Sequence, residues 1–250
     1  MNKKRLIIIG GGAAGFFCAA NAARLNPSLE ISIVEKSSKV LQKVKLSGGG
    51  RCNVTHACFD IDEMASCYPR GARVMKKAFY QFFTTDTIEW FQSRGVALKT
   101  EPDGRMFPVS NSSQSIIDCL MQEIEKQKVK IRLNSAIEKI EPTENKFRLH
   151  YSSGVTEDAG FVMLACGGFA KLTQFDWLKN LELKIDAPVP SLFTFNFPNH
   201  PLNELRGVTV ANAQVKIAGT KLSSQGAVLV THWGLSGPAV LRLSAFAALE

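Results

Sequence analysis

The chain begins with a β-α-β pattern of apolar residues. Residues 6–9 form an unbroken apolar run, which is typical of a strand buried on both faces of a parallel sheet. After a glycine-rich turn, residues 16–25 are Ala-rich and predict a helix that ends before Pro27. Residues 31–34, Ile-Ser-Ile-Val, predict the next strand, which ends in an acid at Glu35.

The periodicity further along the chain predicts more helices and then a change to strands. Helical spacing returns at 71–83, 86–94 and 112–128, with a β-hairpin predicted between them at 96–108. Alternation then predicts a small antiparallel meander of four short strands, at 130–133, 136–141, 147–151 and 156–158. Residues 160–166 predict a second fully apolar strand, whereas residues 36–58 are expected to form a long loop.

The composition shifts at Pro188, where several prolines precede short strands at 208–213, 214–217 and 227–231 and an apolar helix at 239–249. The pattern predicts an α/β protein with two domains. Residues 1–187 would form the first domain, and residues 188–250 would begin a β-rich second one.

Composition and charge limit the classes of protein to which the chain can belong. Hydrophobic residues make up 45% of the 250 residues, and no apolar run is long enough for a membrane span or a signal core, so we expect a cytoplasmic protein. The net charge of +8 suits a partner such as nucleic acid or an acidic substrate, but a basic surface without such a partner is equally compatible. The six cysteines form no C-x-x-C pair and the four histidines lack metal-ligand spacing, so we expect no metal site.

The glycines after the first strand predict a dinucleotide site. In this interpretation Gly10 permits the tight turn, Gly12 lets the backbone approach a pyrophosphate, and Gly15 allows close packing of helix and strand. The N–H groups of the first helical turn would receive the phosphates, and the acid after the second strand would accept hydrogen bonds from the ribose. These candidates are Ala13, Ala14, Glu35 and its neighbour Lys36. The alternative is a glycine turn without a ligand.

Two further glycine clusters lie where a cofactor could be contacted. Residues 47–55, Ser-Gly-Gly-Gly-Arg-Cys-Asn-Val-Thr, offer backbone N–H groups and small polar side chains suited to a pyrophosphate or a flavin edge, although a flexible surface loop is the alternative. The second apolar strand ends at Gly167 and Gly168, at the carboxyl edge of the sheet.

Together with Thr231-His-Trp-Gly-Leu-Ser-Gly-Pro-Ala239, these motifs resemble the bacterial aminoacetone-oxidase-like flavoproteins, also called the BaiN/RdsA family of NAD(P)/FAD-dependent oxidoreductases. The resemblance runs over essentially the whole chain. It implies a Rossmann-like FAD-binding domain of glutathione-reductase type with a β-rich insert domain. It also implies that relatives continue into a C-terminal segment that completes the flavin pocket and that residues 1–250 lack.

The resemblance assigns cofactor contacts position by position. The glycine turn and Glu35 would meet the pyrophosphate and ribose of FAD, and a second strand end would contact the cofactor again. The positions carried over for the flavin side, the adenine and that strand end are Lys43, Ser47, Gly48, Gly50, Arg51, Asn53, Ile137, Ala165, Gly167 and Gly168. Two departures follow the second strand: Cys166 stands where relatives carry Thr, and residues 169–177 lack the small-residue and glycine pattern of the relatives.

Two residues are candidates for catalysis. Cys52 is a candidate proton donor whose thiol pKa Arg51 could lower, and the alternative is a small packed residue. His232 is a candidate acid or base, and the alternative is a hydrogen-bonding residue.

The resulting hypothesis is an FAD-dependent oxidoreductase that transfers hydride between NAD(P)H or substrate and FAD. The resemblance implies either a uridine of ribosomal RNA, reduced to dihydrouridine, or a small molecule such as an amine or bile-acid intermediate. The alternatives are a dehydrogenase that uses NAD alone and a truncated fragment that only binds nucleotide. The sequence leaves the oligomeric state open.

Overall fold

The computed structural model describes residues 4–248, which form two compact units. The first unit comprises residues up to 169 together with 173–185, and the second comprises 170–172 and the residues from 186 onward.

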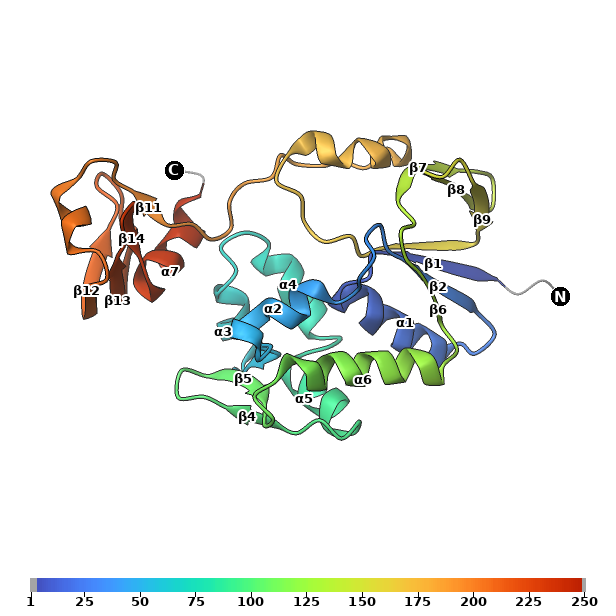
Figure 1. The fold of residues 1–250 in the computed structure, drawn as a ribbon, viewed down its shortest axis with the longest axis horizontal. Helices are drawn as coiled ribbons and strands as arrows, with labels where there is room; N and C mark the ends of the chain where they lie inside the picture. The colour runs from blue at the N-terminus through green and yellow to red at the C-terminus, as the bar shows by residue number, and fades with distance from the viewer. Residues whose placement is uncertain (1–3, 249–250) are drawn as a thin grey trace. The chain divides into compact units, whose positions relative to one another are not determined.

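A four-stranded parallel sheet is the centre of the first unit (Figure 1). Its order is β10-β1-β2-β6, formed by Phe161–Leu164, Arg5–Ile9, Glu30–Val34 and Lys130–Arg132. The β1 and β2 strands are buried on both faces, as the unbroken apolar run of β1 predicted for that strand, and β2 buries Ser32 among its apolar residues. β6 was expected in the meander, but it pairs in parallel with β2. β10 is an edge strand with Phe161 and Met163 exposed, so the expectation of a buried strand there was wrong.

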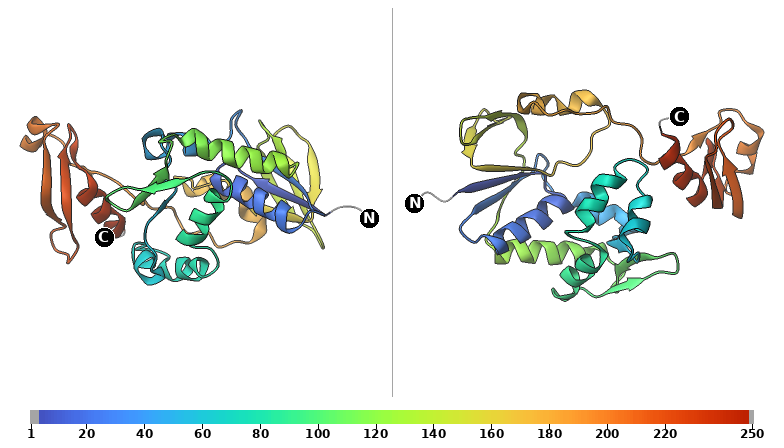
Figure 2. Two further views of the ribbon diagram at one scale, coloured as in Figure 1. Left: turned by 90° about the horizontal axis from the view of Figure 1, so that it is seen from below. Right: turned by 180° about the vertical axis from the view of Figure 1, so that it is seen from behind.

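Helices α1 (Ala13–Leu25) and α6 (Ser113–Lys126) lie side by side on one face of this sheet (Figures 1 and 2). Leu6 and Ile8 of β1 point to this side, where they pack with Phe16 and Leu120. Alternate residues point the other way, because successive side chains of a strand face opposite sides of the sheet.

On the opposite face Ile7 and Ile9 share a core with the meander of β7 (Ile137–Pro142), β8 (Phe147–Tyr151) and β9 (Thr156–Ala159). A 3₁₀ helix, η1 (Leu172–Leu181), contributes Leu178 to this core. The sheet is therefore covered on both faces.

The segment between β2 and α6 adds short helices and a three-stranded antiparallel sheet of order β3-β5-β4. The strands are Thr55–His56, Arg105–Pro108 and Leu98–Thr100, and the β4–β5 hairpin lies where it was predicted. The helices are α2 (Gln42–Gly50), α3 (Ile61–Ser66), α4 (Ala72–Phe79) and α5 (Thr84–Gln92). Residues 36–58 were expected to be loop, but Gln42–Leu46 is helical before the backbone leaves helical geometry at Ser47.

The second unit is β-rich. Its antiparallel sheet has the order β11-β14-β13-β12, formed by Phe195–Asn196, Gly234–Ser236, Ser223–Val230 and Thr209–Lys216. A short 3₁₀ helix, η2 (Pro201–Leu205), follows β11. Helix α7 (Pro238–Ala247), with Pro238 in its first turn, packs Val240 against Val228 of the sheet.

No helix within residues 4–248 has both the length and the apolar character needed to cross a bilayer.

Candidate functional site

The glycine turn after β1 is fixed by close backbone packing. Gly10 has a φ of +119° and donates a hydrogen bond from its N–H to Val34 O at 2.8 Å. A Cβ on Gly10 would lie 2.3 Å from Ala165 O, and one on Gly15 would lie 2.0 Å from Gly10 O. Both positions require glycine because the turn, the end of β10 and the first turn of α1 touch through their backbones.

Gly12 differs from these two glycines because it borders open space. Within residues 4–248, no heavy atom beyond Gly12 and its two chain neighbours lies within 4 Å of the position that a Cβ on Gly12 would occupy. Gly12 is the N-cap residue of α1, and the described residues supply no side-chain cap to this helix. The N–H groups of Ala13 and Ala14 thus begin the helix without an intrahelical acceptor, beside a partial positive charge. This geometry suits a phosphate group.

Glu35 is connected to the glycine turn by its carboxylate. Gly11 N–H donates to Glu35 Oε2 at 2.8 Å, and the N–H and hydroxyl of Ser37 both donate to Oε1 at 2.8 Å. Partial burial acts to raise the pKa of Glu35, but these hydrogen bonds outweigh it and lower the pKa below its ordinary value. The carboxylate is therefore ionised at neutral pH. Oε2 retains an acceptor position for a further donor such as a ribose hydroxyl.

A cavity of about 270 Å³ lies beside Glu35, at the carboxyl ends of β1 and β2. Ile9, Gly10 and Val34 line it from the sheet, and Ile137 lines it from the start of β7. The remaining lining residues are Glu35, Lys36, Ser135, Ala136, Cys166, Phe169, Gln174 and Trp177. Ligands of open α/β sheets bind at this edge of the sheet. The cavity adjoins the glycine turn at Gly10 and has both apolar and polar walls, as ligand pockets usually do.

Lys43 lies near the second strand end. A Cβ on Gly167, whose φ is +76°, would be 3.5 Å from Lys43 Nζ. The start of α2 is held against the glycine turn by a hydrogen bond from Leu41 N–H to Gly11 O, at 2.8 Å. The fold therefore brings a lysine from α2 next to the glycines that follow β10, of which Gly168 is exposed. Ala165 N–H donates to Ile9 O at 2.8 Å, which fixes this strand end beside β1.

The Ser47–Asn53 segment is an ordered loop. Its three glycines all have positive φ, and a Cβ on Gly48 would lie 2.7 Å from the Phe107 ring and 2.8 Å from Asn53 N. Ser47 donates from its hydroxyl to Val44 O at 3.0 Å, and the Asn53 amide can donate to Met106 O and Thr55 O at 3.2 and 3.0 Å. Gly50 is exposed, and within residues 4–248 a Cβ there would meet no heavy atom within 4 Å beyond its chain neighbours and the backbone of its own helix.

Arg51 interacts with the β4–β5 hairpin. Its guanidinium lies 4.0 Å from the centroid of the Phe107 ring, and Nη1 lies 3.2 Å from Glu101 Oε1. Both contacts fix the guanidinium against a neighbour 50 or more residues away in the chain. Part of its charge is thus balanced by Glu101.

Cys52 is buried and adopts a positive φ of 61°. Burial raises the pKa of its thiol above the ordinary value, and a hydrogen bond with Ser47 opposes this only in part. The expectation that Arg51 lowers this pKa was wrong, because the guanidinium faces Phe107 and Glu101. At neutral pH the thiol keeps its proton, so Cys52 is a poor nucleophile but is chemically able to donate a proton.

His232 belongs to the second unit. Its ring meets that of Trp233 edge-on, with centroids 4.3 Å apart, in a pocket of about 590 Å³.

Sequence reasoning missed Gly11 and several residues that line the cavity, namely Ile9, Val34, Ser135, Ala136, Phe169, Gln174 and Trp177. Gly11 was treated as a spacer, although its N–H binds Glu35 and a Cβ there would lie 2.6 Å from Val40. Phe169, Gln174 and Trp177 line the cavity from the segment after β10. Gly11 could have been recognised because it is one of three consecutive glycines. Phe169, Gln174 and Trp177, by contrast, belong to no local sequence motif.

The comparisons with known proteins agree with this architecture. A family model described as HI0933-like protein Rossmann domain matches residues 4–185. Another, described as HI0933-like protein barrel and H2TH domain, matches residues 189–250. Together they match nearly the whole chain.

Two curated relatives are similar over almost the full chain. The 3-dehydro-bile acid delta(4,6)-reductase of Clostridium scindens is 30% identical over 252 residues, covering 96% of this chain and 59% of that protein. The ribosomal RNA dihydrouridine synthase of Escherichia coli is 31% identical over 255 residues, covering 98% of this chain and 62% of that protein. The chain therefore spans about three fifths of the length of these relatives. Among solved structures, Thermovibrio ammonificans THI4 has a TM-score of 0.49 and 10% identity, over 77% of this chain and 67% of that chain.

Proposed function

The chain belongs to the HI0933-like family of FAD-dependent oxidoreductases, and from this premise we propose that it transfers hydride between NAD(P)H or a substrate and FAD. Residues 1–187 would form the N-terminal part of the FAD-binding domain, and residues 188–250 would begin the substrate domain. The observation that carries the proposal is the uncapped start of α1 at Gly12, beside the ionised Glu35 and the cavity that continues from it.

The residues present fit the ADP half of FAD. The Glu35 carboxylate would accept hydrogen bonds from the ribose, and the cavity wall at Ile137 would contact the adenine ring. The first turn of α1 would bind the pyrophosphate through backbone N–H groups, and Lys43 would add positive charge. Lys36, whose Nζ lies 5.5 Å from the centroid of the Phe169 ring, would border the adenosine end of the cavity.

The flavin end would be served by the Ser47–Asn53 loop and the second strand end. When bound, the flavin supplies a ring that accepts and donates hydride. Gly48, Gly50 and Asn53 would position the polar edge of the ring, and Ala165, Gly167 and Gly168 would let the backbone approach it. The Ser47 hydroxyl and Arg51 guanidinium would support this loop through the contacts described above. Cys52, as a neutral thiol, would hold the proton that completes the reduction of a substrate.

The names of the two relatives describe reductive enzymes, and they suggest two candidate substrates for this chain. A uridine of ribosomal RNA is favoured by the net charge of +8, because each neutralised phosphate strengthens binding to RNA. A small molecule of the bile-acid type is the second candidate, and the 30% identity to the delta(4,6)-reductase supports it. Either substrate is compatible with a role in the cytoplasm.

The first experiment is to extract and identify the cofactor of the purified chain, followed by titration with FAD and with NAD. A flavin spectrum and saturable FAD binding would support the proposal. Binding of NAD alone would favour a dehydrogenase without flavin. Binding of FAD that neither NAD(P)H nor a candidate substrate reduces would favour a nucleotide-binding module.

The second experiment addresses the substrate. Dihydrouridine is mapped by reverse transcription in ribosomal RNA from wild-type cells and from cells lacking the gene. Loss of a dihydrouridine signal in the deletion strain is expected, and an unchanged pattern would overturn the RNA substrate while leaving the cofactor assignment intact.

A further inference from the structure

The second unit contains a pocket of its own, of about 590 Å³, at the end of its sheet where β11 leaves and β14 begins. Besides Pro198 and Pro201, its lining consists of amide, imidazole, indole and carboxylate groups, contributed by Asn196, Asn199, Asn203, His200, His232, Trp233 and Glu204. This lining differs from the aliphatic wall that a steroid would require, and it offers many hydrogen-bonding groups to a planar polar ligand.

One wall of this pocket is the turn that carries His232 and Trp233, and the other is the loop after β11. Backbone packing holds these two walls together. A Cβ on Gly234 would lie 2.1 Å from Phe195 O, so glycine is needed for β14 to approach β11. Phe197 N–H donates to Trp233 O at 2.8 Å, and Thr231 Oγ1 exchanges hydrogen bonds with the backbone of Gly234 at 3.0 and 3.1 Å. The turn that carries His232 and Trp233 is therefore fixed against the loop after β11.

Trp233 presents an aromatic surface in this pocket. Its indole Nε1–H donates to Thr194 Oγ1 at 3.2 Å, so the polar end of the side chain is satisfied. The side chain is nevertheless 41% exposed, with the His232 ring edge-on beside it. An oriented, partly exposed indole is a platform on which a nucleobase can stack.

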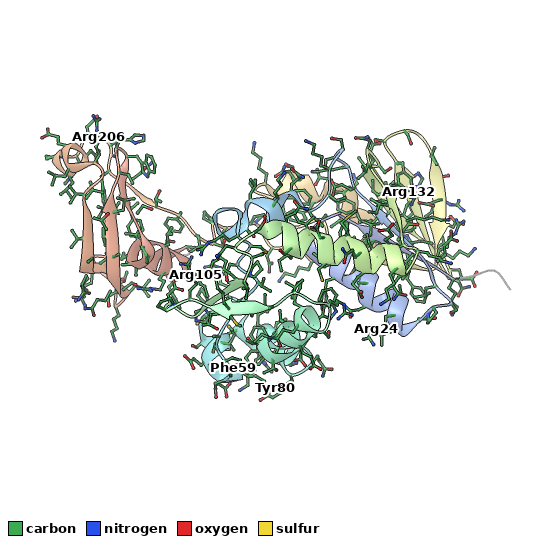
Figure 3. The ribbon with its side chains drawn as sticks, turned by 60° about the horizontal axis from the view of Figure 1, so that its bottom comes forward. Arg24, Phe59, Tyr80, Arg105, Arg132 and Arg206 are labelled. Carbon is green, nitrogen blue, oxygen red and sulfur yellow. The ribbon has the colours of Figure 1, made fainter. Side chains whose placement is uncertain are left out.

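Hydrogen-bonding groups and a cation accompany this platform. His200 Nδ1 accepts from Leu202 N–H at 3.2 Å, so the neutral ring carries its proton on Nε2 and can donate it to a carbonyl oxygen. The Glu204 carboxylate and the asparagine amides can accept from a ring N–H. Arg206 directly follows η2, is exposed at this end of the unit (Figure 3), and has no ion-pair partner within residues 4–248.

We propose that this pocket binds an unpaired pyrimidine nucleotide of RNA, with the base against Trp233 and its phosphate near Arg206. Uracil offers two carbonyl acceptors and one N–H donor, which match the donor of His200 and the acceptors of Glu204 and the asparagines. The inference rests on the proposed function only in taking RNA as the substrate class.

The test is binding of fluorescein-labelled hexauridylate to the 250-residue chain, followed by fluorescence anisotropy at low and at physiological ionic strength. Trp233→Ala is expected to weaken binding by about tenfold, the effect of losing one base-stacking side chain. Arg206→Gln is expected to weaken it by roughly threefold and to make binding less dependent on salt. Phe246→Ala and Lys216→Gln are the matched controls, since they remove an exposed ring and an exposed charge elsewhere in the same unit and are expected to leave affinity unchanged.

Cholate, added to the complex with hexauridylate, tests whether a steroid competes for the pocket. Titration of every variant with FAD separates a failure of this inference from a failure of the proposed function. The inference is overturned if hexauridylate does not bind, if Trp233→Ala and Arg206→Gln both bind as tightly as wild type, or if cholate alone occupies the pocket. Hexauridylate binding that depends on Trp233 in a chain that binds no FAD would support the pocket and overturn the flavoenzyme proposal. Normal FAD binding without hexauridylate binding would do the opposite.

Discussion

The backbone N–H of Gly11 donates a hydrogen bond to Glu35 Oε2 at 2.8 Å, and this contact joins the turn after β1 to the acid that follows β2. The acid therefore orients the glycine turn as well as the proposed ribose site. Its loss should affect both ligand affinity and the stability of the turn.

Glu35→Gln is predicted to weaken FAD binding by roughly tenfold, because a neutral amide replaces the acceptor of charge-assisted hydrogen bonds. Fluorescence titration with FAD measures the change. Glu138→Gln is the control, since Glu138 is an exposed acid one residue beyond the cavity-lining Ile137. Equal affinity of Glu35→Gln and wild type would exclude the ribose assignment.

Glu35 should also make stability depend on pH. Its folded-state pKa is lowered, so its stabilising contribution is complete above the unfolded-state pKa and is lost as pH falls through the folded-state value. Urea unfolding at neutral pH and at pH values below the ordinary Glu range should therefore show a smaller acid-induced loss of unfolding free energy in Glu35→Gln than in wild type. An identical loss in both proteins would contradict the assigned pKa direction.

Two glycines of the same turn should separate ligand binding from folding. Gly12→Ala places its Cβ in open space and should leave the thermal unfolding midpoint nearly unchanged while it obstructs the pyrophosphate and abolishes FAD binding. Gly15→Ala directs its Cβ to within 2.0 Å of Gly10 O and should lower the free energy of unfolding by about 1–3 kcal/mol. Calorimetry and FAD titration of both variants measure this contrast, and a Gly12→Ala protein that binds FAD normally would contradict it.

Lys43→Gln is predicted to raise the dissociation constant for FAD several-fold and to make it less dependent on salt, because Nζ near Gly167 would lose its attraction for the pyrophosphate. Lys45→Gln is the matched control, an exposed lysine on the same helix whose backbone carbonyl, unchanged by the substitution, accepts from Ser113. If both variants bind FAD with the same affinity and salt dependence, Lys43 has no role at the phosphates.

The thiols should differ in reactivity. Burial raises the pKa of Cys52, so iodoacetamide at neutral pH should modify the exposed Cys67 first, and Cys52 should react only slowly, at alkaline pH. Mass spectrometry of peptides from wild type and from Cys67→Ser measures the order of labelling. Labelling of Cys52 as fast as Cys67 at neutral pH would mean that its thiolate is stabilised after all.

The local pattern of residues was sufficient to predict the helix and strands nearest the glycine turn. The apolar run of β1, the Ala-rich α1 and the acid after β2 were all predicted, because each depends on residues close in sequence. The hairpin predicted at 96–108 was also confirmed, because its turn at Pro102-Asp-Gly104 is a local sequence feature. The start of α5 was predicted two residues too late. Asp86 was expected to begin that helix, but its carboxylate accepts from Phe83 N–H at 2.7 Å, because the helix starts two residues earlier.

The sequence was enough to identify a dinucleotide site and the α/β order of the elements around it, since strand, turn, helix and acid are consecutive, and the resemblance of its glycine motifs to a flavoprotein family narrowed the dinucleotide to FAD. The tertiary structure alone decided which distant groups meet them. It placed Ala165 against Gly10, the cavity wall at Trp177 beside Glu35, and Arg51 on Phe107. The physical reason is that hydrophobic periodicity encodes which face of an element is buried, whereas the partner on that face is selected by packing the whole sheet and its coverings.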